Sequence, residues 1–149
     1  MEFRLVQCDA QGIPVEEVAR MPQALLDANA ASAALFADIG FAPPWVSYVA
    51  LDGATAVGGG AFIGAPRDGR VEIAYFTLDG MTGRGYATET ARALLATARR
   101  AAAGVIVAAL TLPEPNASTR VLAKAGFAWF GEARDKDIGR AWEWRAPVP

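Results

Sequence analysis

Apolar residues recur at helical spacing in two long segments of the chain. In residues 22–38 and again in residues 85–100 they fall three or four positions apart, which places them on one face of a helix. Pro22 suits the first turn of the earlier helix because its fixed backbone angle is already helical. Two shorter segments, residues 14–20 and 116–125, have the same character. The pattern therefore predicts about four helices.

Strand patterns occupy most of the remaining chain. Runs of β-branched, aromatic and other apolar residues are bounded by turn residues such as Asp52 and Gly53. Three consecutive glycines, Gly58, Gly59 and Gly60, interrupt one run and indicate either a bulge or a close approach of another backbone. The predicted strands are residues 3–6, 45–51, 56–63, 71–78, 105–112, 127–132 and 140–145.

The order of these segments predicts one α+β domain over residues 1–149. We expect a central mixed, mainly antiparallel sheet of six to seven strands, flanked by about four helices. The run at residues 105–112 is almost wholly apolar, which is typical of a strand covered on both faces. A parallel crossover through the helix at residues 85–100 would join this strand to the one at residues 71–78.

Composition narrows the class of protein. With 53% hydrophobic and 20% charged residues the chain has a globular balance, and no apolar run is long enough to span a membrane. A net charge of -2 gives no general attraction to nucleic acid or to an anionic membrane. Cys8 is the single cysteine and the N-terminus lacks a signal-peptide pattern, so we expect a reducing, cytoplasmic location.

Histidine is absent from the chain. Its absence excludes the common Ser-His-Asp and Cys-His forms of catalysis, together with every metal site that uses histidine. One cysteine cannot form a thiolate zinc site, so no metal is expected. Any general base must therefore be a carboxylate, a lysine, a tyrosine or water.

A glycine-rich turn joins the strand at residues 71–78 to the following helix. Gly83 and Gly85 would let a ligand approach the backbone closely, and the helix start would supply unpaired N–H groups. Arg84 adds a positive charge, so a phosphate is the natural ligand. The turn lacks the Gly-Lys-Ser/Thr of a P-loop and the third glycine of a dinucleotide fingerprint. On spacing alone, a glycine-rich turn without any ligand remains an alternative.

Three blocks of sequence occur in order along the chain. They are Val71-Glu72-Ile73-Ala74-Tyr75, then Gly83-Arg84-Gly85-Tyr86-Ala87-Thr88-Glu89, then Leu112-Pro113-Glu114-Pro115-Asn116-Ala117-Ser118 running on to Gly126-Phe127. Together they resemble the GNAT superfamily of acetyl-CoA-dependent N-acetyltransferases, and in particular its branch of ribosomal-protein N-terminal acetyltransferases. One position departs from the resemblance, because Thr82 stands where the family usually has arginine or glutamine.

The resemblance implies a cofactor site for acetyl-CoA, which would serve as co-substrate. The pantetheine would pair with the backbone of one strand, and the pyrophosphate would lie on the glycine-rich turn. Asn116 would contact the cofactor, cap the helix that follows it, or do both. Thr82 would weaken cofactor binding unless Arg84 compensates for it. The implied cofactor-binding residues are Tyr75, Phe76, Thr77, Gly83, Arg84, Gly85, Tyr86, Ala87, Thr88 and Asn116.

Two residues are candidates for acid–base chemistry. Glu72 alternates onto a mostly apolar strand face, where its pKa would rise, and the resemblance implies a base that acts through water. The alternative is an exposed residue at the start of the strand. Ser118 occupies the position of a serine in the resembling branch and would protonate the departing thiolate. Its alternative role is a residue of the first helical turn.

We therefore expect an N-acetyltransferase that moves an acetyl group directly to a primary amine in a ternary complex. The acceptor would be a small-molecule amine or a peptide N-terminus. Two other interpretations are a non-catalytic or weakly active acyl-CoA-binding module, and a plain interaction domain. The apolar residues 141–144 suggest a possible homodimer contact.

Overall fold

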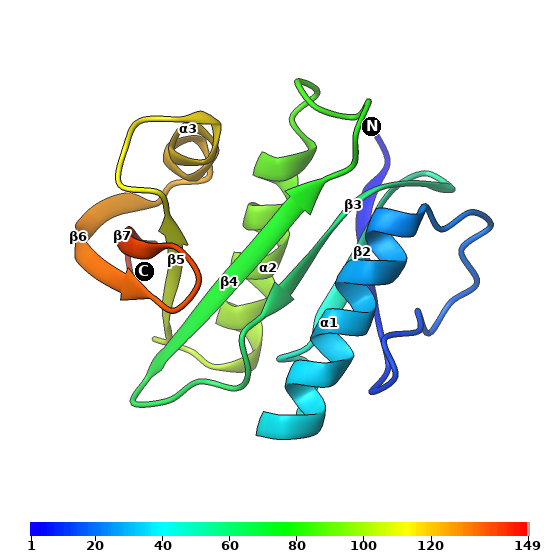
Figure 1. Cartoon of the computed structure of the whole chain (residues 1–149), viewed down its shortest axis with the longest axis horizontal. Helices are drawn as coiled ribbons and strands as arrows, with labels where there is room; N and C mark the ends of the chain where they lie inside the picture. The colour runs from blue at the N-terminus through cyan, green and yellow to red at the C-terminus, as the bar shows by residue number, and fades with distance from the viewer. Residues whose placement is uncertain (149) are drawn as a thin grey trace.

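Seven strands form one open sheet with three helices around it in the computed structural model, which describes residues 1–148 (Figure 1). The predicted α+β architecture is confirmed. The strands are β1 Phe3–Gln7, β2 Ser47–Asp52, β3 Thr55–Phe62, β4 Arg70–Thr77, β5 Ile106–Thr111, β6 Ala128–Asp135 and β7 Gly139–Arg145. The helices are α1 Gln23–Ile39, α2 Tyr86–Ala101 and α3 Ala117–Lys124.

The predicted helix over residues 14–20 is wrong, so three helices replace the expected four within residues 1–148. This segment folds back along β1 instead. The backbone N–H of Val15 donates to the carbonyl of Gln7, and the Asp9 carboxylate accepts from the N–H groups of Gln11 and Ile13. Seven residues form a marginal helix at best, so these tertiary hydrogen bonds decide the conformation.

The strand order is β1-β2-β3-β4-β5-β7-β6, and each neighbouring pair is antiparallel except β4 with β5. That parallel pair is joined through α2, as predicted. β7 lies between β5 and β6, so the predicted dimer segment at residues 141–144 has no free strand edge. A homodimer stays a prediction.

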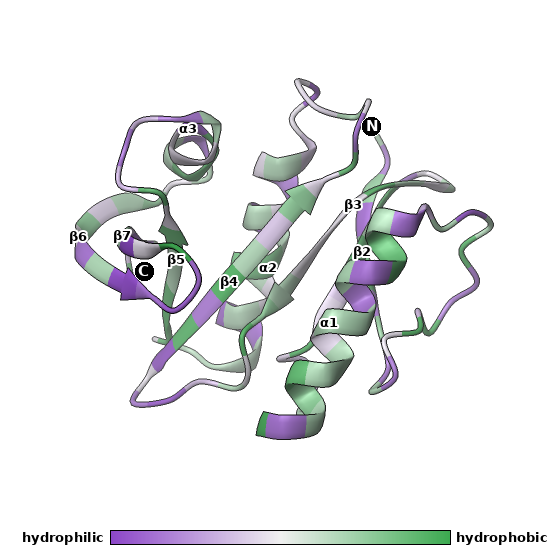
Figure 2. Ribbon diagram, viewed as in Figure 1, coloured by the Kyte–Doolittle hydropathy of each residue, from purple (hydrophilic) through white to green (hydrophobic). Residues whose placement is uncertain are grey.

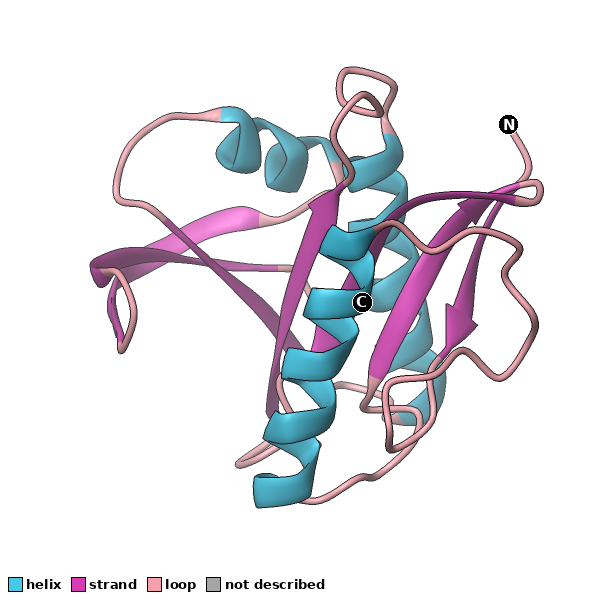
Figure 3. Ribbon diagram, turned by 45° about the vertical axis from the view of Figure 1, so that its right-hand side comes forward, coloured by secondary structure: helices cyan, strands magenta, loops and turns pink. Residues whose placement is uncertain are grey.

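Helices α1 and α2 lie on opposite faces of the sheet (Figures 1 and 3). On the α2 face, Leu94 packs in one buried cluster with Ile73 and Val107. On the α1 face, Leu25 packs in another cluster that includes Phe76 at its margin. Figure 2 shows that β4 and β5 differ in hydropathy. Hydrophilic and hydrophobic residues alternate in the first half of β4, whereas β5 is mostly hydrophobic.

Strands β4 and β5 separate after a short parallel ladder. Their pairing begins at Arg70 with Ile106 and ends at Ile73 with Ala109. β3 continues to pair with β4 as far as Thr77. Residues 74–77 therefore have a strand partner on one side only, which leaves a backbone edge open on the other. This separation positions the site described below.

The glycines of β3 mark a close backbone approach, one of the two alternatives that the sequence indicated. A Cβ added at Gly58 would lie 2.3 Å from the carbonyl oxygen of Phe76 on β4. At Gly60 it would lie 2.9 Å from a methyl of Leu94 on α2. The register of β3 with β2 also shifts beside these glycines: Ala50 pairs with Gly58 but Leu51 pairs with Ala56, so the extra residue, Val57, lies on β3.

Replacing Gly58 with alanine should destabilise the fold. The clash is with backbone, which cannot move without breaking the β3–β4 pairing, so we expect a loss of about 1–3 kcal/mol in unfolding free energy. Thermal unfolding would measure it as a fall of several degrees. Gly131→Ala on β6 is the matched control, because its added Cβ meets no atom within 4 Å. Equal midpoints for the two variants would contradict the argument.

Candidate active site

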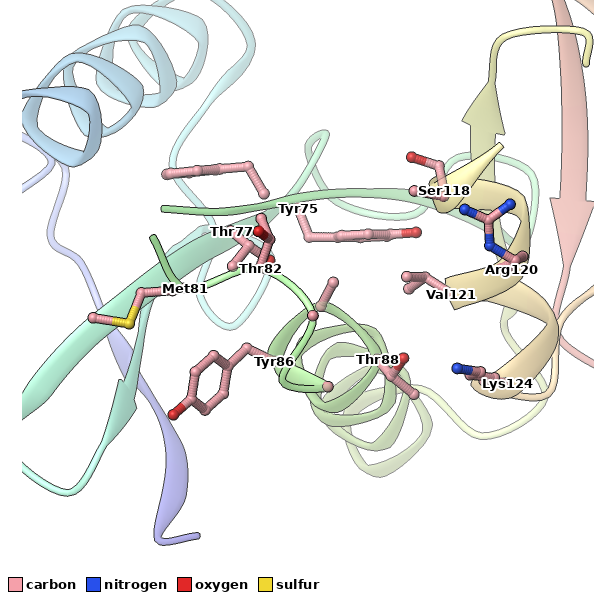
Figure 4. Close-up of a pocket in the computed structure, with 15 residues that line it drawn as sticks. Tyr75, Thr77, Met81, Thr82, Tyr86, Thr88, Ser118, Arg120, Val121 and Lys124 are labelled. Carbon is pink, nitrogen blue, oxygen red and sulfur yellow. The ribbon is translucent and has the colours of Figure 1, made fainter. Parts of the chain in front are cut away.

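A cavity of about 520 Å³ opens where β4 and β5 separate (Figure 4). Its walls come from the end of β4, the turn that precedes α2, the first turn of α2 and one face of α3. We call this cavity the cleft. Its lining residues are Tyr75, Phe76, Thr77, Met81, Thr82, Gly83, Gly85, Tyr86, Ala87, Thr88, Ala117, Ser118, Arg120, Val121 and Lys124.

The start of α2 points hydrogen-bond donors into the cleft. Gly85 is the N-cap with a positive φ of 84°, a conformation that favours glycine, and no side chain caps the helix. The first intrahelical hydrogen bond runs from the N–H of Glu89 to the carbonyl of Gly85, so the N–H groups of residues 86–88 precede the helical ladder. Unpaired N–H groups and the positive end of the helix dipole are the features that attract an anion to a helix start.

Most of the predicted cofactor-binding residues line the cleft, but two do not. The Arg84 guanidinium points to the Met81 sulfur, with 3.8 Å between nitrogen and sulfur. The Asn116 side chain is occupied as the cap of α3, where it accepts from the Thr119 N–H at 3.0 Å. The Thr119 hydroxyl accepts in return from the Asn116 N–H, which completes a capping box.

Two cations that the sequence analysis missed, Arg120 and Lys124, line the cleft from α3 (Figure 4). Both are exposed, and neither guanidinium nor ammonium group takes part in an ion pair recorded within residues 1–148. The helical period contained the signal, because Arg120 and Lys124 follow Ala117 by three and seven residues and so lie on the same side of the helix. Arg120 and Lys124 therefore bring positive charge to the cleft, whereas the uncharged Thr82 brings none.

Tyr86 anchors the start of α2 to the far end of β2. Its hydroxyl donates to the Asp52 carboxylate at 2.6 Å, and the other carboxylate oxygen accepts from the Glu2 backbone N–H at 2.9 Å. These two hydrogen bonds lower the pKa of Asp52. The ring of Tyr86 therefore forms part of the cleft wall while its hydroxyl is engaged elsewhere.

A second cavity of about 240 Å³ brings Glu72 and Ser118 together. Tyr75 and Ser118 line both this cavity and the cleft, so the two spaces share a wall. Asp135, from the end of β6, also lines the second cavity. The two predicted acid–base residues, 46 positions apart in sequence, therefore meet at the separation of β4 and β5.

Glu72 is partly buried on β4, and burial raises the pKa of its carboxyl group. The Arg70 guanidinium, 3.7 Å from the carboxylate, lowers that pKa, whereas the charges of Asp135 and Glu143 raise it. Arg70 is itself held by Glu143 at 3.0 Å, which divides its charge between two carboxylates. The net result is a raised pKa, which suits a base that works near neutral pH.

Ser118 lies in the first turn of α3 with an exposed side chain. The cap of this helix is Asn116, so Ser118 does not cap α3 but occupies its first turn, as the alternative interpretation expected. Its hydroxyl makes no hydrogen bond to protein within residues 1–148. It is free to donate into either cavity.

Other chemistry has little support in residues 1–148. No group of three or more His, Cys, Asp or Glu side chains there lies close enough to hold a metal ion. The same residues include no helix with the length and apolar character needed to cross a bilayer. Burial raises the pKa of the Cys8 thiol, which disfavours its reactive thiolate form.

Comparison with known families agrees with this geometry. The chain matches the Acetyltransferase (GNAT) domain family over residues 13–128. It belongs to the GNAT acetyltransferase family. The matched region contains β4, the turn before α2, and α3, which together form the cleft of this GNAT domain. No curated protein sequence matches the chain significantly.

Solved structures share the GNAT fold at low sequence identity. RimL, an alpha-N acetyltransferase of a ribosomal protein, aligns with a TM-score of 0.71 and 16% identity over 99% of this chain and 94% of its own. A ribosomal-protein alanine acetyltransferase from Vibrio fischeri aligns at 0.68 and 12%, with coverages of 99% and 94%. The aminoglycoside acetyltransferase AAC(6')-Ib, in complex with coenzyme A and kanamycin, aligns at 0.57 and 19%. That alignment covers 67% of this chain and spans 64% of the enzyme's length.

Proposed function

We propose that this GNAT protein is an acetyl-CoA-dependent N-acetyltransferase that transfers the acetyl group directly to a primary amine in a ternary complex. The observation that carries the proposal is the composition of the cleft. An open strand edge, an uncapped helix start and two cations line one cavity. The relative AAC(6')-Ib holds coenzyme A, which supports the same cofactor for this chain.

The cleft can hold each part of acetyl-CoA with a different kind of group. The open backbone edge at residues 74–77 can pair with the amides of pantetheine. The N–H groups at the start of α2, next to Gly83 and Gly85, can bind the pyrophosphate. Arg120 and Lys124 add positive charge from the opposite wall. Arg84 and Asn116, which point elsewhere, contribute less than the sequence suggested.

The reaction uses the two residues that meet in the second cavity. Glu72, acting through a water molecule, takes a proton from the acceptor ammonium. The free amine nitrogen forms a bond to the thioester carbonyl carbon, the carbon–sulfur bond breaks, and the nitrogen loses its second proton to solvent. The Ser118 hydroxyl passes its proton to the thiolate while it takes one from solvent in the same step, so that no alkoxide forms. A backbone N–H within residues 75–77 stabilises the oxyanion.

The acceptor is either a small-molecule amine or a peptide N-terminus. Glu72 and Asp135 place two carboxylates on the second cavity, which favours a cationic acceptor over one that carries its own carboxylate beside the amine. Ile138, an exposed apolar side chain on the same cavity, would contact the carbon skeleton of that acceptor.

The second candidate function is a catalytically weak acyl-CoA-binding module. Thr82 favours it, because the cleft has a hydroxyl where the family usually places arginine or glutamine. Leu122 also favours it, since many GNAT enzymes have a tyrosine proton donor there and this leucine is fully buried.

Calorimetric titration with acetyl-CoA, followed by a thiol-release assay on a panel of primary amines, tests both functions. For the enzyme we expect a dissociation constant of about 1–100 µM and saturable thiol release with at least one amine. Binding without thiol release on any amine would favour the binding module. A folded protein that binds no CoA species would contradict both functions.

A further inference from the structure

The chain has three tyrosines, and their hydroxyl groups have different surroundings. The Tyr48 hydroxyl donates to the carbonyl of Pro44 at 2.7 Å, and the Tyr86 hydroxyl donates to Asp52 at 2.6 Å. The Tyr75 hydroxyl has no protein partner within residues 1–148. A phenol that is partly buried without a partner costs free energy unless water or a ligand accepts its hydrogen bond.

The Tyr75 side chain crosses the cleft from β4 toward α3 (Figure 4). Its ring is partly buried and packs against the main core cluster, which restricts its rotation. Within residues 1–148, the side-chain polar atom that is buried without a hydrogen bond is Asn29 Nδ2. The Tyr75 oxygen also has no hydrogen bond to protein but is not among such buried atoms, so it is open to the cleft. The hydroxyl is thus held in the space between β4 and Ser118.

We propose that Tyr75 is a further catalytic residue, whose hydroxyl donates a hydrogen bond to the sulfur of coenzyme A as the thiolate departs. This inference rests on the proposed function. No proton moves from Tyr75: it stabilises the negative charge on sulfur, while the proton reaches the thiolate from solvent through the Ser118 hydroxyl, which gains one proton as it passes the other on. Leu122 cannot play this part, because its side chain is apolar and fully buried.

The protonation state of Tyr75 agrees with this role. Burial raises its pKa to about 12, so the phenol keeps its proton and stays a hydrogen-bond donor at neutral pH. A thiolate is a weaker base than such a phenolate, so the hydrogen stays on the tyrosine oxygen. Other charged side chains line the same spaces: Arg120 and Lys124 line the cleft from α3, and Glu72 lines the adjoining cavity. A test must therefore change the hydroxyl alone.

The thiol of bound coenzyme A reports on Tyr75 without an acceptor amine. Its titration can be followed by thiolate absorbance in the complex of the full chain with coenzyme A. In Tyr75→Phe we expect the pKa of the bound thiol to rise by about one unit or more, since a hydrogen bond to a charged group is lost. Tyr48→Phe is the matched control: it also removes a hydroxyl from a tyrosine that packs in the main core cluster, but that hydroxyl donates to the Pro44 carbonyl and Tyr48 does not line the cleft. Its thiol should titrate as in the parent protein.

The outcomes separate this inference from the proposed function. An unchanged thiol pKa in Tyr75→Phe, with coenzyme A bound, would overturn the role of Tyr75 and leave the proposed function intact. An equal rise in Tyr48→Phe would also overturn it, because a general disturbance of the packing would then explain both results. Failure of the folded parent protein to bind coenzyme A would overturn the proposed function and this inference together.

Discussion

Gly85→Asp should abolish most of the affinity for acetyl-CoA. An aspartate at this position places a carboxylate at the anion site of α2, where it repels the pyrophosphate. It also has to adopt a φ of 84°, which costs a side-chain-bearing residue about 1–2 kcal/mol. We expect the dissociation constant to rise at least about thirtyfold, or roughly 2 kcal/mol, by calorimetry.

Gly80→Asp provides a control both for the added negative charge and for the backbone strain of an aspartate at positive φ. Gly80 has a φ of 82° and an added Cβ would meet no atom within 4 Å, so strain and charge are matched. Gly80 lies in the same connection between β4 and α2 but does not line the cleft. Similar losses in the two variants would mean that the turn binds no phosphate, and normal affinity in Gly85→Asp would exclude the site outright.

Glu72→Gln should lower turnover while leaving acetyl-CoA affinity unchanged. Glutamine has nearly the same shape but cannot accept the proton, and removal of a general base costs about 10²–10⁴-fold in rate. In the parent protein, activity should fall on the acid side as Glu72 is protonated, at a pH above the ordinary carboxyl range because its pKa is raised. The variant should lose the part of this fall that follows the Glu72 carboxyl and keep only the dependence on protonation of the acceptor amine.

The defect of Glu72→Gln should be greatest near neutral pH and shrink as the pH rises. At high pH a growing share of the acceptor is already the free amine, so less proton removal is required. Initial rates across about pH 6–10 with the best amine of the panel would measure this profile. Glu132→Gln is the control, since Glu132 is exposed on β6 and outside both cavities. An unchanged profile in Glu72→Gln would remove this residue from the mechanism.

The two variants together distinguish the candidate functions. Loss of binding in Gly85→Asp and loss of turnover in Glu72→Gln are both expected of an acetyltransferase. If binding depends on Gly85 but no amine is acetylated by the parent protein, the acyl-CoA-binding module is favoured. In that case Thr82 and Leu122 would be positions at which this GNAT domain lacks side chains that other family members use for cofactor binding and for acetyl transfer.

The sequence by itself determined the features that depend on local pattern. Strand and helix periods identified every strand and all three helices, because alternation and helical spacing reflect which side chains are buried. The extra helix at residues 14–20 was the error, since a short segment without a core face takes its conformation from hydrogen bonds to β1. Gly83 and Gly85 marked the turn before α2 in the sequence, and both have the positive φ that favours glycine, but their role in phosphate binding stays a prediction.

Only the tertiary structure decided which side chains reach the cleft. Adjacent residues in a loop or a helix point in different directions, so sequence alone could not show that Arg84 turns toward Met81. Nor could it show that Asn116 is used as a cap while Arg120 and Lys124 face the cofactor cleft. The meeting of Glu72 with Ser118 depends on where β4 and β5 stop pairing, and the unpartnered hydroxyl of Tyr75 depends on what lies across that gap. Local propensity fixes the elements, whereas their long-range packing fixes the site.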